Sequence, residues 1–434
     1  MIDFNLRKST YLFLFLFLNL QLISCAQNGQ LKSVKVKSKK GQSLKSKGQS
    51  SKFKGQSLKL EIKTGAERSN LYLNLLKGKN VAVVANQTSV LSVKVSDSKK
   101  EIHHLVDYLY NNKEINVKKV FAPEHGFRGK ADAAEFVKDG LDAKTGLPIV
   151  SLYGKNKKPS AKQLSGIDVV VFDIQDVGVR FYTYISTLHY VMEACAEVGI
   201  NVIILDRPNP NAHYVDGPVL ELKHKSFVGM HPIPVVHGMT VGEYAMMVNG
   251  EKWLAKGVQC NLEVVACLNY DHLTEYNLPV RPSPNLPNQS SVYLYPSLCF
   301  FEGTIVSIGR GTNIPFQIYG HPEYPGVFKF RPEPVKGASM NPKWKGQTCS
   351  GQDLRDIGIS DLFQRPHLHI EYVIDAYNKL GKPKNFFTKY FDTLAGTTRI
   401  RTMIIDGFSA DEIRATWKDD VSRFLKLREK YLLY

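Results

Sequence analysis

The densest cluster of reactive side chains lies between residues 168 and 184, in the sequence DVVVFDIQDVGVRFYTY. Acidic, amide, guanidinium and tyrosyl groups gather there around one glycine, namely Asp173, Gln175, Asp176, Arg180, Tyr182 and Tyr184. Carboxylates can exchange protons, an arginine can hold an anion, and tyrosine hydroxyls can bind polar ligands. The cluster as a whole favours a ligand site, although any single residue in it could belong to a capped structural loop.

The segment Pro123-Glu124-His125-Gly126 is a second candidate for chemistry, because it follows an apolar run at residues 117–122. Glu124 is our first candidate for a general acid and base, since a carboxyl group next to a buried strand is partly withdrawn from water. His125 could orient Glu124 or share its role, or it could be a hydrogen-bonded structural residue.

Alternating strands and helices explain how side chains from distant segments could meet. The predicted strands span residues 80–85, 117–122, 149–153, 169–174, 201–205 and 262–267, and the predicted helices span residues 101–110, 184–197 and 240–254. This order predicts an α/β fold with a doubly wound, mostly parallel sheet. Four of the strands end in polar clusters, which would converge on one edge of such a sheet.

A proline-rich stretch between residues 279 and 287 predicts an extended crossing between two domains. We place the first domain at residues 67–283 and the second at residues 284–434. In the second, the glycines beside Arg310 would let the backbone approach a ligand and the guanidinium hold a carboxylate, although a plain turn explains them equally well. Helices are predicted there at residues 351–363, 369–379 and 410–431.

Cofactor and metal chemistry has little support in the sequence. No predicted strand is followed by a Gly-x-Gly-x-x-Gly or Walker-type loop, which disfavours nucleotide-dependent chemistry. Cysteine and histidine show no metal-ligand spacing, and we expect His367 and His369 to be surface residues. The five cysteines besides Cys25 are expected to be buried thiols, with a Cys260–Cys267 disulfide as the alternative.

The N-terminal segment predicts export and attachment to a membrane. Residues 1–25 combine a basic start, a short Leu- and Phe-rich run and the sequence Leu22-Ile23-Ser24-Cys25, as a bacterial lipoprotein signal does; cleavage after Ala26 is the alternative. Residues 26–66 form a low-complexity tether, and 13 Lys and Arg against two acidic residues in 1–65 account for +11 of the net charge of +17. We expect a periplasmic, membrane-anchored protein whose tether meets anionic lipids or wall polymers rather than nucleic acid.

Six motifs together resemble the NamZ-type exo-β-N-acetylmuramidases, over roughly residues 70 to 434. They are Asn86-Gln87-Thr88, Pro123-Glu124-His125-Gly126, the segment 173–184, Asp206-Arg207-Pro208-Asn209-Pro210, Phe301-Glu302-Gly303-Thr304 and Gly309-Arg310-Gly311-Thr312. The resemblance implies a Rossmann-like N-terminal domain, a smaller C-terminal α/β domain and an active-site cleft between them. It also implies release of terminal N-acetylmuramic acid from the non-reducing end of peptidoglycan fragments.

The resemblance leaves the second catalytic group open. Asp173 or Asp176 could be a nucleophile or a base for water. Alternatively, the N-acetyl oxygen of the substrate could attack C1, with Asp173, Asp176 and Tyr182 polarising the amide, and we favour this version. Glu302 could bind sugar hydroxyls or serve as the second carboxylate.

The lactyl carboxylate of muramic acid calls for a cation, and Arg180, Arg207 and Arg310 are the candidates. Arg180 could instead pair with Asp176 as a structural partner. Other residues expected to bind substrate are Asn86, Gln87, Arg128, Gln175, Tyr184, Asn209 and Glu302. No cofactor or metal is expected, and the oligomeric state is not specified by the sequence.

Two other classes of function remain compatible with the sequence. A wall-binding lipoprotein could hold muropeptides in the same cleft without cutting them. A metal-dependent amidase or deacetylase is a weaker alternative that depends on Glu124-His125 and scattered acids.

Overall fold

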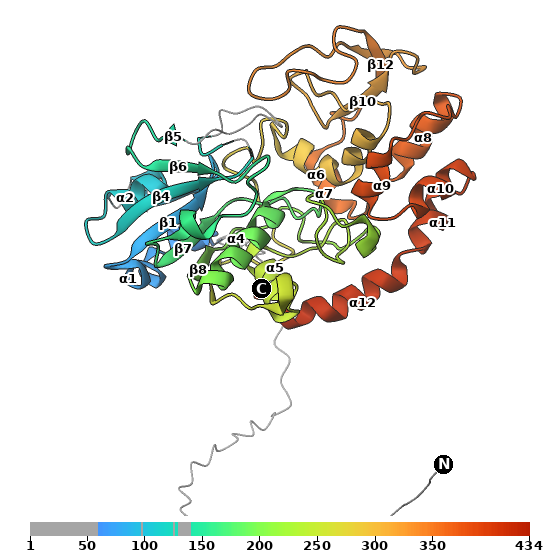
Figure 1. The fold of residues 1–434 in the computed structure, drawn as a ribbon. Helices are drawn as coiled ribbons and strands as arrows, with labels where there is room; N and C mark the ends of the chain where they lie inside the picture. The colour runs from blue at the N-terminus through green and yellow to red at the C-terminus, as the bar shows by residue number, and fades with distance from the viewer. Residues whose placement is uncertain (1–59, 97–98, 125, 129–139) are drawn as a thin grey trace, which may run out of the picture. The chain divides into compact units, whose positions relative to one another are not determined.

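The computed structural model describes residues 60–96, 99–124, 126–128 and 140–434. The predicted signal segment, Cys25 and nearly all of the tether lie outside these residues. The part of the chain from Lys59 to Tyr434 forms one compact unit (Figure 1). Within its described residues, every helix is too short or too polar to cross a membrane.

A seven-stranded sheet organises the first half of this unit, in the order β5-β6-β4-β1-β7-β8-β9. Its strands are β1 (Asn80–Ala85), β4 (Asn116–Ala122), β5 (Gly140–Leu141), β6 (Pro148–Ser151), β7 (Val169–Asp173), β8 (Asn201–Leu205) and β9 (Leu262–Val265). Strands β6, β4, β1, β7, β8 and β9 pair in parallel, and β5 pairs antiparallel to β6. The predicted Rossmann-like, mostly parallel sheet is therefore confirmed.

Helices cover both faces of this sheet, and every residue of β7, which lies next to the central strand β1, is buried. They are α1 (Leu73–Leu76), α2 (Leu105–Tyr110), α3 (Ala161–Leu164), α4 (Tyr184–Val198) and α5 (Val241–Gly250). Phe172 belongs to the core that contains α4 and α5, whereas its neighbour Val171 belongs to the core that contains α2. Successive residues of β7 thus face opposite sides of the sheet, and a hydrophobic core packs against each side.

The helix predicted at residues 101–110 is wrong in its first half. Strand β3 (Lys100–His104) pairs there with β2 (Val90–Lys94) as an antiparallel hairpin. Ile102, which fits the helical spacing, is 71% exposed on this hairpin. The helix begins only at Leu105, where the His104 ring accepts a hydrogen bond from the Val106 N–H and caps it.

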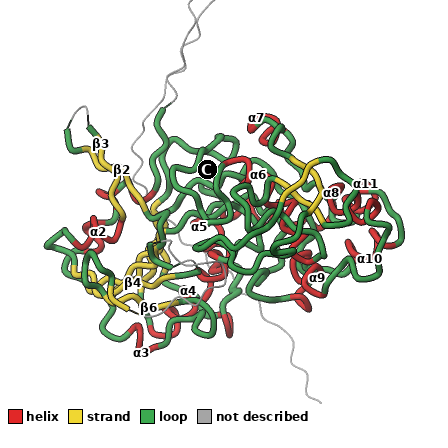
Figure 2. The backbone as a smooth tube through the Cα atoms, turned by 90° about the horizontal axis from the view of Figure 1, so that it is seen from above, coloured by secondary structure: helices red, strands yellow, loops and turns green. Residues whose placement is uncertain are grey.

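The second half combines a small sheet with a group of short helices (Figure 2). The sheet has the order β10-β12-β11, and the elements are α6 (Gln289–Leu298), β10 (Ile318–His321), β11 (Phe328–Phe330), β12 (Cys349–Asp353), α7 (Ile359–Gln364), α8 (Glu371–Lys379), α9 (Lys389–Ala395), α10 (Arg399–Ile405), α11 (Ala410–Ala415) and α12 (Lys418–Arg428). The helix predicted at 351–363 is wrong at its start, because residues 349–353 pair antiparallel with both neighbouring strands. The helix predicted at 410–431 is divided between α11 and α12.

Arg180 joins segments that are far apart in the sequence. Its buried guanidinium donates to the carbonyls of Pro218, Ile233, Leu394 and Ala395 at 2.7–3.0 Å. The alternative of a structural pair with Asp176 is not formed among the described residues; four carbonyl oxygens accept from Nη1 and Nη2, and Nε has no partner there. The expectation of buried thiols is confirmed, since the described cysteines Cys195, Cys260, Cys267, Cys299 and Cys349 are all buried and free.

Candidate active site

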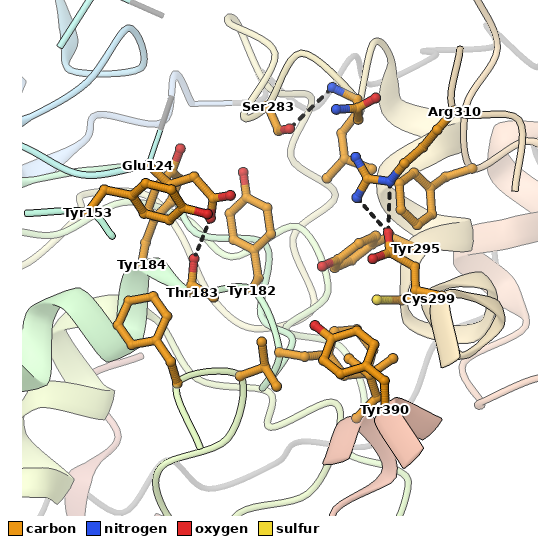
Figure 3. A pocket seen from close by; sticks show the side chains of 18 of the residues that line it. Glu124, Tyr153, Tyr182, Thr183, Tyr184, Ser283, Tyr295, Cys299, Arg310 and Tyr390 are labelled. Atoms are coloured by element: carbon orange, nitrogen blue, oxygen red, sulfur yellow. Dashed lines mark hydrogen bonds and ion pairs between the residues drawn. The ribbon is translucent and has the colours of Figure 1, made fainter. Parts of the chain in front are cut away.

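A pocket of about 410 Å³ is lined by residues from both halves of the chain (Figure 3). Its size is that of a small-molecule site. One part of its wall follows the carboxyl ends of β4, β6 and β7, and the other comes from α6, α9 and the turns near residues 283–286 and 302–316. The pocket thus occupies the cleft predicted between the two halves.

Glu124 lies at the pocket wall, two residues after the end of β4. The Thr183 hydroxyl donates a hydrogen bond of 3.1 Å to its Oε2 atom (Figure 3). Thr183 immediately precedes α4, so the start of this helix helps to fix a carboxylate that follows β4. Glu124 has no ion-pair partner among the described residues.

Tyrosines surround Glu124 on its side of the pocket. Tyr153, Tyr182 and Tyr184 all lie near it (Figure 3). Burial, and then the negative charge of Glu124, raise the pKa of Tyr153 and of Tyr184. The Tyr182 hydroxyl donates to the carbonyl of Pro282 at 2.8 Å. These phenols stay protonated at neutral pH and offer hydroxyl groups beside the carboxylate.

Arg310 faces Glu124 from the opposite side of the pocket (Figure 3). Its Nε and Nη2 atoms contact Glu302 Oε1 at 2.9 and 2.5 Å, and its guanidinium lies 5.1 Å from the centre of the Phe316 ring. Gly309 and Gly311 adopt φ of +77° and +84°, so the segment is a tight turn that needs glycine. The turn presents Arg310 to the pocket, and both glycines pack closely against the protein itself, since a Cβ would meet Ile318 at Gly309 and Pro342 at Gly311.

Asp173 and Arg207 are placed together, but away from the described lining of the pocket. Arg207 Nε and Nη2 contact the two oxygens of Asp173 at 2.6 and 2.9 Å, and both side chains are fully buried. Arg207 also donates to the carbonyl of Val90 at 2.8 Å. This bidentate pair ties β7, β8 and β2 to one another behind the site.

The predicted amide residues support the loops around the pocket. Asn86 Oδ1 accepts from the Thr88 N–H at 2.8 Å, and Gln175 Nε2 donates to the Pro208 carbonyl at 2.7 Å. Gln87 donates at 3.1 Å to the Pro282 carbonyl that Tyr182 also contacts. Two other predicted residues lie outside the described lining of the pocket. Asn209 donates to the Met239 carbonyl at 2.9 Å, and Arg128 pairs with Asp107 and Asp142 at 3.0 and 2.7 Å. His125 is outside the described residues.

Sequence reasoning missed several residues of the pocket wall. Tyr153 and Lys157 follow β6 at the same edge as Glu124. A check of the polar residues at and just after the end of the strand predicted at residues 149–153 would have found them. Lys157 lies 4.4 Å from the Phe227 ring and adds a second cation to the pocket. Tyr295 and Tyr390 come from α6 and α9, whose sequences carry no signal beyond apolar packing.

Asp176 is fully buried, outside the described lining of the pocket. The Gly178 N–H donates to its Oδ2 at 2.6 Å, and its Oδ1 has no hydrogen-bond partner among the described residues. Burial raises the pKa of Asp176 from 3.8 to about 7. The folded protein therefore holds a proton on this carboxyl group more tightly than the unfolded chain does.

We expect Asp176→Asn to remove part of the pH dependence of stability. A raised carboxyl pKa contributes stability that is complete below about pH 4 and is lost as the pH rises towards 7, with a slope of at most about 1.4 kcal/mol per pH unit. Urea unfolding of both proteins between about pH 4 and pH 7 measures this slope. The control Asp406→Asn changes an exposed residue and should keep the wild-type slope. An equally steep slope in Asp176→Asn would show that Asp176 ionises normally in the folded protein.

Known families and structures match almost the whole described chain. Two family descriptions, "Exo-beta-N-acetylmuramidase NamZ, N-terminal" and "C-terminal", match residues 81–290 and 293–434. A protein of Bacillus subtilis (strain 168) named peptidoglycan beta-N-acetylmuramidase NamZ is 38% identical over an alignment 387 residues long, which covers 84% of this chain and 89% of that protein.

Two solved structures from Bacteroides fragilis NCTC 9343, each described as a DUF1343 family protein, share the fold. The first is 46% identical with a TM-score of 0.78, and it covers 86% of this chain and 99% of its own. The second is 31% identical with a TM-score of 0.70 and the same coverage of both chains.

Proposed function

Because this chain belongs to the exo-β-N-acetylmuramidase NamZ family and is a glycoside hydrolase, we propose that it releases terminal N-acetylmuramic acid from the non-reducing ends of peptidoglycan fragments. One observation carries the proposal. The pocket sets a carboxylate without an ion-pair partner among the described residues, Glu124, opposite a guanidinium, Arg310. Glycoside cleavage needs a carboxyl group such as that of Glu124, and binding of a sugar that bears a carboxylate needs a cation such as Arg310.

Glu124 acts as the general acid and base in this proposal. In its protonated form, it donates a proton to the glycosidic oxygen while the bond from that oxygen to C1 breaks. As a carboxylate, it then takes a proton from the water that adds to C1. Thr183 fixes the carboxyl group through the 3.1 Å hydrogen bond to Oε2.

The acetamido group of the substrate supplies the second catalytic group. Its carbonyl oxygen attacks C1 as the leaving group departs, and the resulting cyclic intermediate is opened by water. Two observations support this assignment over a second carboxylate: Asp173 is held by Arg207, and Glu302 is held by Arg310. Tyr184, beside Glu124, is the hydroxyl donor available to orient the amide, because its OH has no hydrogen-bond partner among the described residues, whereas the Tyr182 hydroxyl donates to the Pro282 carbonyl.

Fluorination of the N-acetyl group is expected to slow turnover stepwise. Each fluorine withdraws electrons from the carbonyl oxygen and makes it a poorer nucleophile, so the rate should fall from acetyl to fluoroacetyl to trifluoroacetyl muramides. The measurement is kcat on the three chromogenic substrates. The same rate on all three would indicate that an enzyme carboxylate attacks C1 instead.

Export and a lipid anchor on Cys25 are also part of the proposal. Their support is the sequence of residues 1–25, which has the layout of a lipoprotein signal. Export would bring the protein to the compartment of its proposed substrate. In bacterial cells expressing the full chain, we expect the wild type in the membrane fraction and labelled by radioactive palmitate. Cys25→Ser should lose the label; a Cys25→Ser protein that still carries it would contradict acylation at this residue.

Product analysis tests the exo mode of action. Incubation with muramic-acid-terminated glycan chains should release one free N-acetylmuramic acid per cut, while chains that end in N-acetylglucosamine should stay intact. Mass spectrometry of the soluble products distinguishes this result from internal cleavage. Binding of the fragments without any release would favour a muropeptide-binding protein.

A further inference from the structure

We propose that His367, His369 and Glu371 bind a divalent transition-metal ion of the zinc class. The three residues lie on the connection between α7 and the start of α8, outside the described lining of the pocket. One ligand atom from each side chain lies within 4.8 Å of the others. The site does not depend on the proposed hydrolase activity.

The backbone presents these three side chains on one side. They alternate with Leu368 and Ile370, which are both completely buried, whereas the three polar residues are partly exposed. The two imidazole rings lie next to each other, with centroids 4.0 Å apart. The earlier expectation of ordinary surface histidines does not account for this convergence.

Hydrogen bonds from two other segments fix this connection. The Leu368 N–H donates to Asp216 Oδ2 at 2.7 Å, and the His369 N–H donates to the Ser297 hydroxyl at 2.9 Å. The ligands therefore project from a held backbone, so less conformational entropy is lost when they bind an ion.

One oxygen of Glu371 is available for an ion. Oε1 forms an ion pair with Arg414 at 2.7 Å, whereas Oε2 is buried and has no hydrogen-bond partner among the described residues. Arg414 is also paired with Asp411 at 2.8 Å, which compensates its charge. Arg365 adds a positive charge near His369, so binding must come from direct coordination rather than from long-range attraction.

Two imidazoles and one carboxylate suit zinc better than calcium or magnesium, which prefer oxygen ligands throughout. Tetrahedral zinc places its ligands roughly 3.3 Å apart, so the side chains must approach one another by about 1.5 Å. A water molecule would complete the coordination. The site lies beside α6, because Ser297 of that helix accepts the hydrogen bond from the His369 N–H; α6 also supplies Tyr295 to the pocket.

Cobalt titration tests the site on the full chain, purified without a histidine tag and freed of metal with EDTA. The wild type should bind Co²⁺ saturably, with a visible spectrum that Zn²⁺ abolishes by displacement. His367→Gln and His369→Gln should each weaken binding by more than the ~10- to 100-fold that the loss of an outer hydrogen-bond partner costs. His103→Gln, which changes a partly exposed imidazole on β3, should bind as the wild type does.

Thermal unfolding supplies a second readout. Zn²⁺ should raise the melting temperature of the wild type and of His103→Gln, but not that of His367→Gln or His369→Gln. If one of the two histidine variants does not fold, the other still tests whether the proposed ligands bind the ion. The proposal is overturned if the wild type shows no saturable Co²⁺ spectrum, or if a folded His367→Gln or His369→Gln binds Co²⁺ as tightly as the wild type.

Discussion

Glu124→Gln is expected to lower kcat on a chromogenic N-acetylmuramide by roughly 10²- to 10⁴-fold, the range that general acid–base catalysis contributes. The amide has the size of the carboxyl group and can still accept the Thr183 hydrogen bond, but it cannot exchange a proton. Substrate affinity and melting temperature should therefore change little. Steady-state kinetics, calorimetric titration with a muropeptide and thermal unfolding measure the three quantities.

A distant glutamate provides the matched control for this substitution. Glu197→Gln makes the same chemical change near the end of α4, where the side chain is 47% exposed and pairs with Lys158. It should leave kcat at the wild-type value. If Glu124→Gln retains wild-type kcat, another group supplies the proton and the assignment of Glu124 is wrong.

Arg310→Gln is expected to lower kcat/KM for an N-acetylmuramide by about 10- to 100-fold, which corresponds to the about 1.5–3 kcal/mol of a charged hydrogen bond. The physical reason is that a guanidinium can hold the lactyl carboxylate of muramic acid, and the glucosaminide has no such group. The kcat/KM for the muramide, divided by the kcat/KM for the glucosaminide, should therefore fall. Parallel kinetics on both substrates measure it.

Glu302 complicates this substitution, because Arg310→Gln leaves its carboxylate without the guanidinium. The double variant Arg310→Gln/Glu302→Gln removes that unpaired charge and should show the same fall in the ratio. Lys157→Gln tests the other cation of the pocket. If Lys157→Gln, rather than Arg310→Gln, lowers the ratio, then Lys157 binds the lactyl group. If Arg310→Gln lowers kcat/KM equally on both substrates, a selective role for Arg310 is excluded.

Much of the sheet could be predicted from local sequence. Strands β1 and β8 have the predicted bounds, since short β-branched runs between polar segments have few other ways to bury themselves. The two wrong helix starts, at residues 101 and 351, belong to strands whose partners lie elsewhere in the chain. Their pairing depends on contacts that local spacing does not contain.

The site was predictable in outline but not in detail. The motifs identified the family, which the comparisons confirm, and five of the residues named from them line one pocket, namely Glu124, Tyr182, Tyr184, Glu302 and Arg310. Asp173 and Arg207 follow neighbouring strands in the same way, yet they turn inward to each other. A polar residue at a strand end looks the same in sequence whether it meets a ligand or a buried partner, so only the fold separates the two cases.

The most direct test of the account is the ratio of kcat/KM for a chromogenic N-acetylmuramide and the matching N-acetylglucosaminide, measured on the wild type. Both sugars carry the acetamido group, and only the muramide carries the carboxylate that Arg310 is proposed to bind. We expect rapid release from the muramide and little from the glucosaminide. Equal release from both sugars, or faster release from the glucosaminide, would contradict it.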